Sequence, residues 1–441
     1  MLLLFAGSIV LAQSPPDLQC ATPDAISALQ GRQPASWPTM LDAPVGVGNA
    51  HRPPPPDGHK VPYGQPTGLF LETENFLISW EDGSLSLDSI DRTADALEGA
   101  WTQLVEIQGW PAPVSSERYL IWVIFDPDLS GTGFTTEYFD EVYPQGYPVI
   151  FVNPTNIELE AFWASLMVHE FMHTVHFTMR DYRFDLTEET WYWEASATHA
   201  SELAAPDVDG HQYISAAYAE FPEARYDTRE RAHDYGMFVL NAWLEDPDLG
   251  VGPGTMHAIW RAGAERPDAL WDELIADVTR RDAVTVWAAF AADYGNQQMP
   301  ESSQYTPARL KGTLSEQGDG RLPYLGTDYW EIEADGRMMA TGDVRVSTPD
   351  GVFLPQTTAA VQRGDIIAVT AAVDGADYTL VHLEEDARDL SQDTGDAAAR
   401  RTPESTMTRG CADRGTQMGS GVLVWMVLLW RRRPRQVHAE E

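Results

Sequence analysis

The spacing of apolar residues changes several times along the chain and divides it into segments. An apolar stretch at 1–12 precedes a proline-rich segment at 13–66, which is expected to form an extended linker. From residue 67 to 311, apolar residues recur at the spacings of strands and helices and predict a folded region. From 312 to 387, short alternating apolar runs between Asp-Gly and Gly-Asp turns predict a region made of strands.

The first folded region is expected to mix strands with helices. Strands are predicted at 76–80, 119–125 and 148–152, and helices at 89–108 and 157–177, with loops over 126–147. Five further helices are predicted at 210–221, 228–244, 254–264, 269–279 and 283–294. In the second region, four apolar runs at 329–332, 343–346, 366–373 and 378–383 predict a small β-sandwich. The predicted fold class is therefore α+β.

Residues 169–173 read His-Glu-Phe-Met-His and match the pattern HExxH. On a helix, His169 and His173 project from one face about one turn apart, so two neutral imidazoles can hold one Zn²⁺. Glu170 would lie beside the metal without binding it, and could take a proton from water held by the metal. The pattern therefore predicts a zinc-dependent hydrolase.

A catalytic zinc site needs a third protein ligand, and Glu194 is the predicted one. Structural sites commonly use cysteines, but Cys20 and Cys411 are the only two in the chain and lie far out in the termini. A third histidine at position 179 is excluded because that residue is Met. Glu194 opens a run of small residues about twenty positions after the motif, which favours a second helix packed closely against the first. Rival carboxylates between the two helices are Asp181, Asp185, Glu188 and Glu189.

Three further polar residues near these ligands have open roles. His176 shares the face of the ligand histidines, so it could be an alternative ligand, but it is expected to lie behind them or in the core. His199 and Glu202 follow Glu194 on the same predicted helix, and either could orient a ligand histidine through its second ring nitrogen. The sequence does not separate these two alternatives.

The segments HEFMHTVH and WYWEASATHASE resemble those of secreted gluzincins common in myxobacteria, whose pattern is close to HEFFHxxQ and then WxxEGxAxWxE. The resemblance extends over 75–383. It implies a gluzincin-like metallopeptidase fold, with His169, His173 and Glu194 as zinc ligands and Glu170 as the base. Two departures are visible: Ala195 stands where the family has Gly, and His176 stands where it has a polar amide.

The resemblance also implies two features around the cleft. In gluzincins, a helical region below the cleft supplies a Tyr or His that stabilises the oxyanion, and His233 and Tyr235 are the candidates here. Tyr235 is favoured because the pair Tyr235-Gly236 matches the family. The strand at 148–152 is expected to be the edge strand beside the cleft, where its backbone could pair with an extended peptide.

The charge of the chain restricts its partners. Asp and Glu number 67 against 29 Lys and Arg, which gives a net charge of −38. Such an acidic chain is not expected to bind nucleic acid or an anionic membrane surface. A peptide or protein is the expected substrate, and the oligomeric state is left open.

Both termini predict export. Residues 1–12 suit a signal peptide cleaved after Ala12. At the other end, an acidic spacer at 388–410 precedes a segment at 411–441 that contains Cys411, a short apolar run and an arginine cluster. This arrangement resembles a myxobacterial C-terminal sorting signal, which implies processing at Cys411 and membrane contact only before that step. The alternative is a weak tail anchor. The predicted location is outside the cell, secreted or on the outer surface of a Gram-negative bacterium.

These observations predict a secreted or surface-attached zinc endopeptidase. Two alternatives stay open: a surface-displayed binding or adhesion protein with a structural or vestigial zinc site, and a zinc hydrolase of non-peptide amides or esters.

Overall fold

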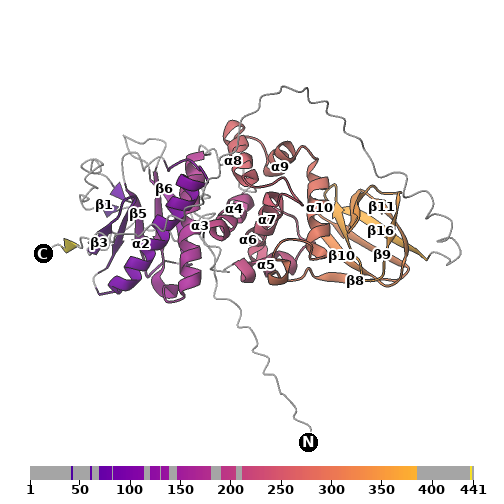
Figure 1. Ribbon diagram of the computed structural model, residues 1–441, viewed down its shortest axis with the longest axis horizontal. Coiled ribbons are helices and arrows are strands. Elements are labelled where there is room, and N and C mark those ends of the chain that lie inside the picture. Colours follow the sequence, from indigo (N-terminus) through magenta and orange to yellow (C-terminus); the bar gives the residue numbers. More distant parts are fainter. Residues whose placement is uncertain are drawn as a thin grey trace, which may run out of the picture. The chain divides into compact units, whose positions relative to one another are not determined.

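A mixed sheet of six strands forms the first layer of the fold in the computed structural model (Figure 1). The structure describes residues 41–42, 60–61, 69–81, 83–113, 120–129, 131–138, 147–179, 190–204, 211–384 and 438–439. In pairing order, the strands are β17 (His438–Ala439), β3 (Leu69–Glu72), β4 (Phe76–Trp80), β5 (Ile121–Phe125), β7 (Tyr147–Val152) and β6 (Gly133–Tyr138). Strands β4, β5 and β7 are parallel, whereas β3 and β6 run antiparallel to their neighbours.

The central strands are covered on both faces, which explains why their apolar residues do not alternate with polar ones. Every residue of β4 and β5 is buried. On one face, helices α2 (Leu87–Trp101) and α3 (Glu160–Met179) pack on the sheet, and the ring of Phe171 in α3 contacts that of Phe76. On the other face, Leu77, Trp122 and Ile124 are also buried, in a cluster to which the stacked rings of Phe134 and Phe151 belong. The sheet therefore holds α3 in place along its length.

The edge of this sheet differs from the prediction. The strand expected at the edge, 148–152, is β7 and lies between β5 and β6. The outermost described strand on that side is β6, in a segment that was predicted to contain only loops. Its residues facing α3, Gly133 and Thr135, are small or polar and give no apolar alternation. The prediction that 148–152 forms the edge strand was therefore wrong, because β6 lies outside it.

The middle of the chain is helical, as predicted. Its helices are α4 (Trp191–Ala204), α5 (His211–Ala219), α6 (His233–Gly236), α7 (Phe238–Glu245), α8 (Thr255–Glu265), α9 (Trp271–Thr279) and α10 (Ala283–Gly295). The single helix predicted at 228–244 is broken, because Arg231 and Ala232 adopt left-handed backbone angles with φ of 57° and 58°. The helix predicted at 89–108 changes geometry instead, since α2 continues as a π-helix, η1 (Thr102–Ile107). Short 3-10 turns are η3 (Pro154–Asn156), η6 (Glu230–Ala232) and η7 (Ser302–Gln304).

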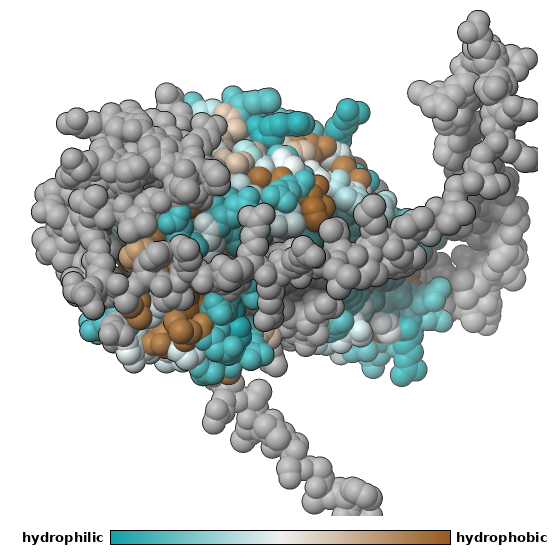
Figure 2. Space-filling model, turned by 60° about the vertical axis from the view of Figure 1, so that its left-hand side comes forward, coloured by the Kyte–Doolittle hydropathy of each residue, from teal (hydrophilic) through white to brown (hydrophobic). Residues whose placement is uncertain are grey.

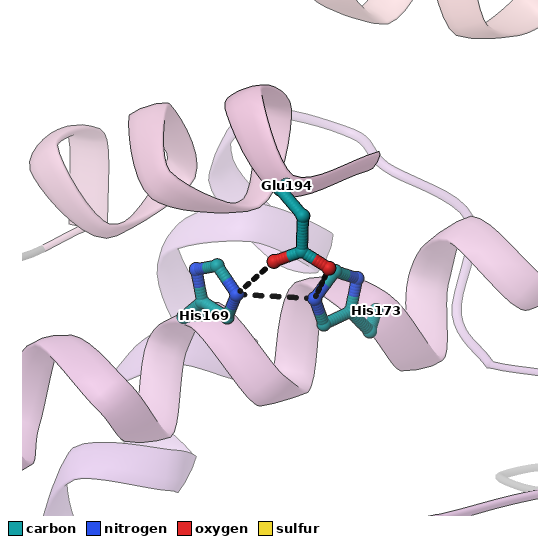
Figure 3. Close-up of side chains that lie close together, drawn as sticks. All are labelled: His169, His173 and Glu194. Carbon is teal, nitrogen blue, oxygen red and sulfur yellow. Dashed lines mark hydrogen bonds and ion pairs between the residues drawn. The ribbon is translucent and has the colours of Figure 1, made fainter. Parts of the chain in front are cut away.

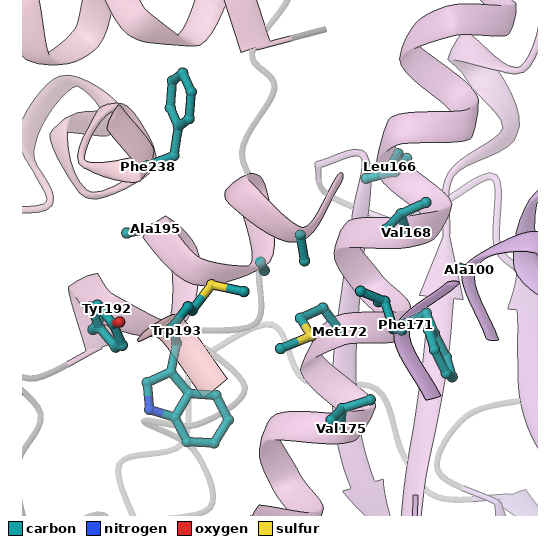
Figure 4. Close-up of a cluster of buried hydrophobic side chains, with 14 of the residues drawn as sticks. Ala100, Leu166, Val168, Phe171, Met172, Val175, Tyr192, Trp193, Ala195 and Phe238 are labelled. Atoms are coloured by element: carbon teal, nitrogen blue, oxygen red, sulfur yellow. The ribbon is translucent and has the colours of Figure 1, made fainter. Parts of the chain in front are cut away.

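Aromatic and sulfur-containing side chains fill the space between α3 and the helices that follow it. Figure 4 shows Met172 of α3 facing the helix that carries Trp193 and Ala195, with Phe171 and Val175 directed to the opposite side. The tryptophans at 191, 193, 260 and 271 are among the largest fully buried side chains. This packing fixes α4 against α3.

The predicted β-sandwich is present as two sheets. One sheet contains, in pairing order, β13 (Gly351–Phe353), β12 (Val344–Thr348), β15 (Ile366–Ala371), β10 (Thr327–Ile332) and β8 (Leu310–Leu314). The other contains β14 (Thr358–Val361), β11 (Gly336–Gly342), β16 (Ala376–Glu384) and β9 (Gln317–Leu322). The four predicted runs correspond to β10, β12, β15 and β16. The other five strands are short or alternate with glycine and charged residues, which hid them in the sequence.

The sandwich packs directly on the helices. The hydroxyl groups of Tyr218 in α5 and Tyr329 in β10 are hydrogen-bonded at 2.9 Å in a buried position. The side chain of Asn296 binds the backbone of Ile366 twice, accepting from its N–H at 3.0 Å and donating to its C=O at 2.7 Å. The sheet, the helices and the sandwich accordingly belong to one compact unit.

Several predicted segments lie outside the described residues. These are the signal peptide at 1–12, the spacer at 388–410, and nearly all of the linker at 13–66 and of the tail at 411–441. Within the linker the structure describes only two short paired strands, β1 (Leu41–Asp42) and β2 (Lys60–Val61). Within the tail it describes only β17.

Hydrophilic residues cover much of the described surface in Figure 2, and hydrophobic residues form a few separate patches among them. Among the described helices, none combines the length and the apolar character needed to cross a bilayer.

The buried tyrosine pair gives a test of the contact between helices and sandwich. In Tyr329→Phe, the hydroxyl of Tyr218 loses its partner, which should cost about 1–3 kcal/mol of folding free energy. In the double variant Tyr218→Phe/Tyr329→Phe, the destabilisation should be smaller than the sum of the two single variants, as measured by chemical denaturation. Strict additivity would show that the hydroxyl groups do not interact.

Candidate metal centre

Helix α3 carries the two histidines of the HExxH motif toward α4. Its twenty residues contain no Gly or Pro, and the segment from Leu166 to Phe177 is buried all round. His169 and His173 lie on the side that faces α4, one turn apart, as the spacing predicted. Both are buried, which is unusual for histidine unless its ring nitrogens are engaged.

Helix α4 brings Glu194 to the same point. It begins at Trp191, so Glu194 lies in its first turn, where a carboxylate interacts favourably with the helix dipole. Small residues at 195, 196 and 197 follow and are completely buried, which lets α4 approach α3 closely. Glu194 itself has no exposed surface. The rival carboxylates Asp181, Asp185, Glu188 and Glu189 lie outside the described residues.

The three side chains converge on one point (Figure 3). Nε2 of His169 lies 3.1 Å from Oε2 of Glu194 and 3.1 Å from Nε2 of His173. Nε2 of His173 lies 3.6 Å from Oε1 of Glu194. Around a tetrahedral zinc ion with bonds of about 2.0–2.1 Å, ligand atoms are separated by about 3.3–3.4 Å. The buried His169, His173 and Glu194 could therefore hold a metal ion, and their spacing fits one of zinc's size.

The charge of Glu194 depends on the two histidines. Burial alone would raise the pKa of its carboxyl group, but the charge and hydrogen bonds of His173 and His169 lower it to about 2. Burial likewise opposes the charged form of His169, yet its hydrogen bond to Glu194 and the charges of Glu194 and Glu170 raise its pKa above the ordinary value. The charged carboxylate of Glu194 is thus stabilised by positive charge next to it, and a divalent cation between the three side chains would supply that charge.

Thr198 supports His169 from behind. Its hydroxyl lies 3.5 Å from Nδ1 of His169, so Nε2 is the nitrogen that faces the other two ligands. The sequence had offered His199 and Glu202 for this role. Thr198 follows Glu194 by four residues and so shares its helix face, a spacing that could have identified it.

His176 is placed in the core, as expected. Its ring stacks on that of Trp260 with centroids 3.9 Å apart, and its Nε2 lies 3.2 Å from the hydroxyl of Ser196. Burial, followed by the nearby His173 and His169, lowers its pKa well below the ordinary value. His176 therefore packs behind the metal group as a neutral ring.

Glu170 lies on α3 between the two histidines and faces strand β6. It is completely buried. The hydroxyl of Thr135 lies 2.8 Å from Oε2 of Glu170 and 2.9 Å from its backbone carbonyl oxygen. Thr135 was missed in the sequence, because β6 was predicted to be a loop.

Of the two candidates for oxyanion stabilisation, Tyr235 lies beside the metal group. Its ring is nearly parallel to that of His169, with centroids 5.8 Å apart. His233, two residues earlier on α6, contacts the ring of Tyr218 and is 1 % exposed. Neither ring nitrogen of His233 has a hydrogen-bond partner among the described residues. Burial lowers its pKa from 6.5 to about 4.

Loss of one ligand should remove the metal and also weaken the fold. In His173→Ala, the buried carboxylate of Glu194 loses one of the two imidazoles beside it, and leaving a buried polar group without its partner typically costs about 1–3 kcal/mol. Zinc analysis and thermal denaturation of the purified variant measure both effects. The matched variant His257→Ala, which removes a half-buried histidine stacked on Trp110, should keep the metal. Wild-type zinc content in His173→Ala would contradict the assignment.

The buried His233 should make stability depend on pH. Because its pKa is 6.5 in its ordinary state and about 4 when folded, the unfolded chain binds the proton more tightly. The stability it contributes is complete above about pH 6.5 and is lost as the pH falls toward 4, by about 3 kcal/mol. In His233→Leu, denaturation curves should show a pH dependence weaker by this amount. The same dependence of the unfolding free energy on pH in wild type and variant would refute the expectation.

Comparisons of the chain with models of protein families, with curated protein sequences and with solved structures find no match. The resemblance of the two motifs to gluzincins therefore stays a prediction, and the chemistry of the site rests on its own geometry.

Proposed function

We propose that this chain is a zinc-dependent endopeptidase of the gluzincin type, acting on peptide or protein substrates. The observation that carries the proposal is a second acid, Glu170, held beside a buried group of two histidines and one carboxylate. A site that only binds metal does not need this carboxylate, whereas hydrolysis needs a base at that position. This difference favours an enzyme over an adhesion protein with a structural zinc.

The roles of the residues follow from their positions. His169, His173 and Glu194 would hold the zinc ion, which would supply a Lewis acid able to polarise a carbonyl group and to lower the pKa of water to about 7. Glu170 accepts the proton of the attacking water and passes it to the leaving amine. Tyr235, beside the ring of His169, donates a hydrogen bond to the oxygen of the tetrahedral intermediate.

Strand β6 provides a place for an extended substrate. The backbone N–H of Asn153 donates to the carbonyl of Thr132 at 2.8 Å. Since hydrogen-bonding directions alternate along an antiparallel strand, the backbone of Gly133 faces away from β7. A peptide laid along this outer side would bring its scissile bond next to Glu170. This supports an endopeptidase, which binds its substrate on both sides of the cleaved bond.

The proposal includes export from the cell. It is supported by the apolar segment at 1–12 and by the sequence of 411–441, which resembles a sorting signal. The net charge of −38 supports a protein without nucleic acid as a partner.

Substitution of the base tests the mechanism. Glu170→Gln should retain zinc, because Glu170 is not a ligand, and should lose about 10²–10⁴-fold in kcat because the amide cannot accept the proton. Metal analysis and steady-state kinetics on one peptide measure the two quantities. Glu265→Gln, the same change at an exposed position of α8, should behave as wild type. Turnover by Glu170→Gln close to that of wild type would refute the role of Glu170.

The substrate class is tested with a peptide library and a set of small esters and amides, each with and without a chelator. Chelator-sensitive cleavage inside the peptides supports the proposal. Turnover of esters alone would instead favour a non-peptide hydrolase. A zinc-loaded protein that cleaves nothing would favour a surface-displayed binding protein.

A further inference from the structure

The backbone of β6 lies directly against the carboxylate of Glu170. Two residues of this strand face it, Gly133 and Thr135, because side chains two positions apart lie on the same face. The next residue, Thr136, lies on the opposite face together with Phe134, which stacks on Phe151. The contact with Glu170 is therefore made by one face of one strand.

We propose that Gly133 and Thr135 form a cradle that positions the Glu170 carboxylate for proton transfer, with Thr135 as a positioning residue. This inference rests on the proposed peptidase function, since it concerns the base of that reaction. In this arrangement, Oε2 of Glu170 accepts a hydrogen bond from the hydroxyl of Thr135, and Oε1 is the oxygen that accepts and releases the proton.

The hydroxyl of Thr135 is suited to hold the carboxylate in one orientation. It carries one proton and lies within hydrogen-bond distance of two acceptors that belong to Glu170, Oε2 at 2.8 Å and the backbone carbonyl at 2.9 Å. The second acceptor is part of helix α3 and fixes the hydroxyl relative to the backbone that carries the base. A hydrogen bond to an ionised oxygen is also stronger than one between neutral groups. Rotation of the Glu170 side chain would break this bond.

Gly133 makes room for the other carboxylate oxygen. A Cβ atom at this position would lie 2.9 Å from Oε1 of Glu170 and 3.3 Å from both Cδ and Cγ. The backbone of Gly133 does not have the positive φ that calls for glycine elsewhere in this chain. The absence of a side chain is therefore explained by the space that Glu170 occupies. The clash is with the end of a flexible side chain, so alanine should displace the base while leaving the fold intact.

Three variants test the cradle against the wild type. Thr135→Val keeps the shape but removes the hydroxyl and should lower kcat about 10–100-fold, the usual effect of removing a group that orients an active-site residue. KM and zinc content should stay near the wild-type values. Thr135→Ser restores the hydroxyl and should recover most of the activity. Gly133→Ala should lower kcat with zinc content and melting temperature unchanged.

The matched control is Thr136→Val, which makes the same change one residue along the strand on the other face of the sheet. Thr136 is buried to a similar degree, so a general loss of strand stability would affect both valine variants equally. Wild-type kcat in Thr135→Val would overturn the proposal. An equal loss in Thr136→Val, or no recovery in Thr135→Ser, would also overturn it.

Crystal structures of the same variants supply a readout that does not depend on turnover. The Glu170 carboxylate should move in Thr135→Val and Gly133→Ala, and should keep its position in Thr135→Ser and Thr136→Val. If the wild type cleaves no peptide, the proposed function fails while these structures still decide the cradle. If the wild type is active and the carboxylate does not move in Thr135→Val, the cradle alone is rejected.

Discussion

A carboxylate without access to water is stable in a protein only where positive charge or hydrogen-bond donors surround it, and Glu194 meets this condition through two imidazoles. Helix α4 supplies the acid and helix α3 supplies the rings, so the two helices must be in register to within one turn. The small residues after Glu194 permit the close approach, and the tryptophans of the following helices fill the remaining volume. The aromatic packing of the helical region can thus be understood as the support of this one electrostatic contact.

The other elements are arranged around that contact. The sheet holds α3 from one side, and β6, the outermost described strand next to β7, places the hydroxyl of Thr135 against the carboxylate of Glu170. Tyr329 and Ile366 of the sandwich form hydrogen bonds with Tyr218 of α5 and with Asn296 at the end of α10. The sandwich is therefore part of the same packed unit. Among its described residues there is no group of three His, Cys, Asp or Glu side chains close enough to hold a metal ion.

The sequence predicted the parts of the fold and site that depend on local spacing. His169 and His173 share a helix face because four residues make about one turn. The run of small residues after Glu194 indicated a second helix packed closely against the first. Strand β5 is apolar throughout and β4 is apolar except for Ser79, and both were identified for that reason. Strand β6 was missed because Gly133 and Thr135 face a buried polar group, so no apolar alternation marks the strand. Thr198 was missed because a threonine in a helix has no pattern of its own, although its spacing from Glu194 places it on the ligand face.

The missing side chain at Gly133 has a consequence for the evolution of this protein by mutation. A methyl group there would press on the side chain of Glu170 rather than on the backbone, so the fold would persist while the Glu170 carboxylate would have to move. Selection that acts on abundance alone would not detect the replacement. On the proposed function, active and inactive versions of this protein would stand one nucleotide change apart at this position, since every glycine codon becomes an alanine codon through a single base.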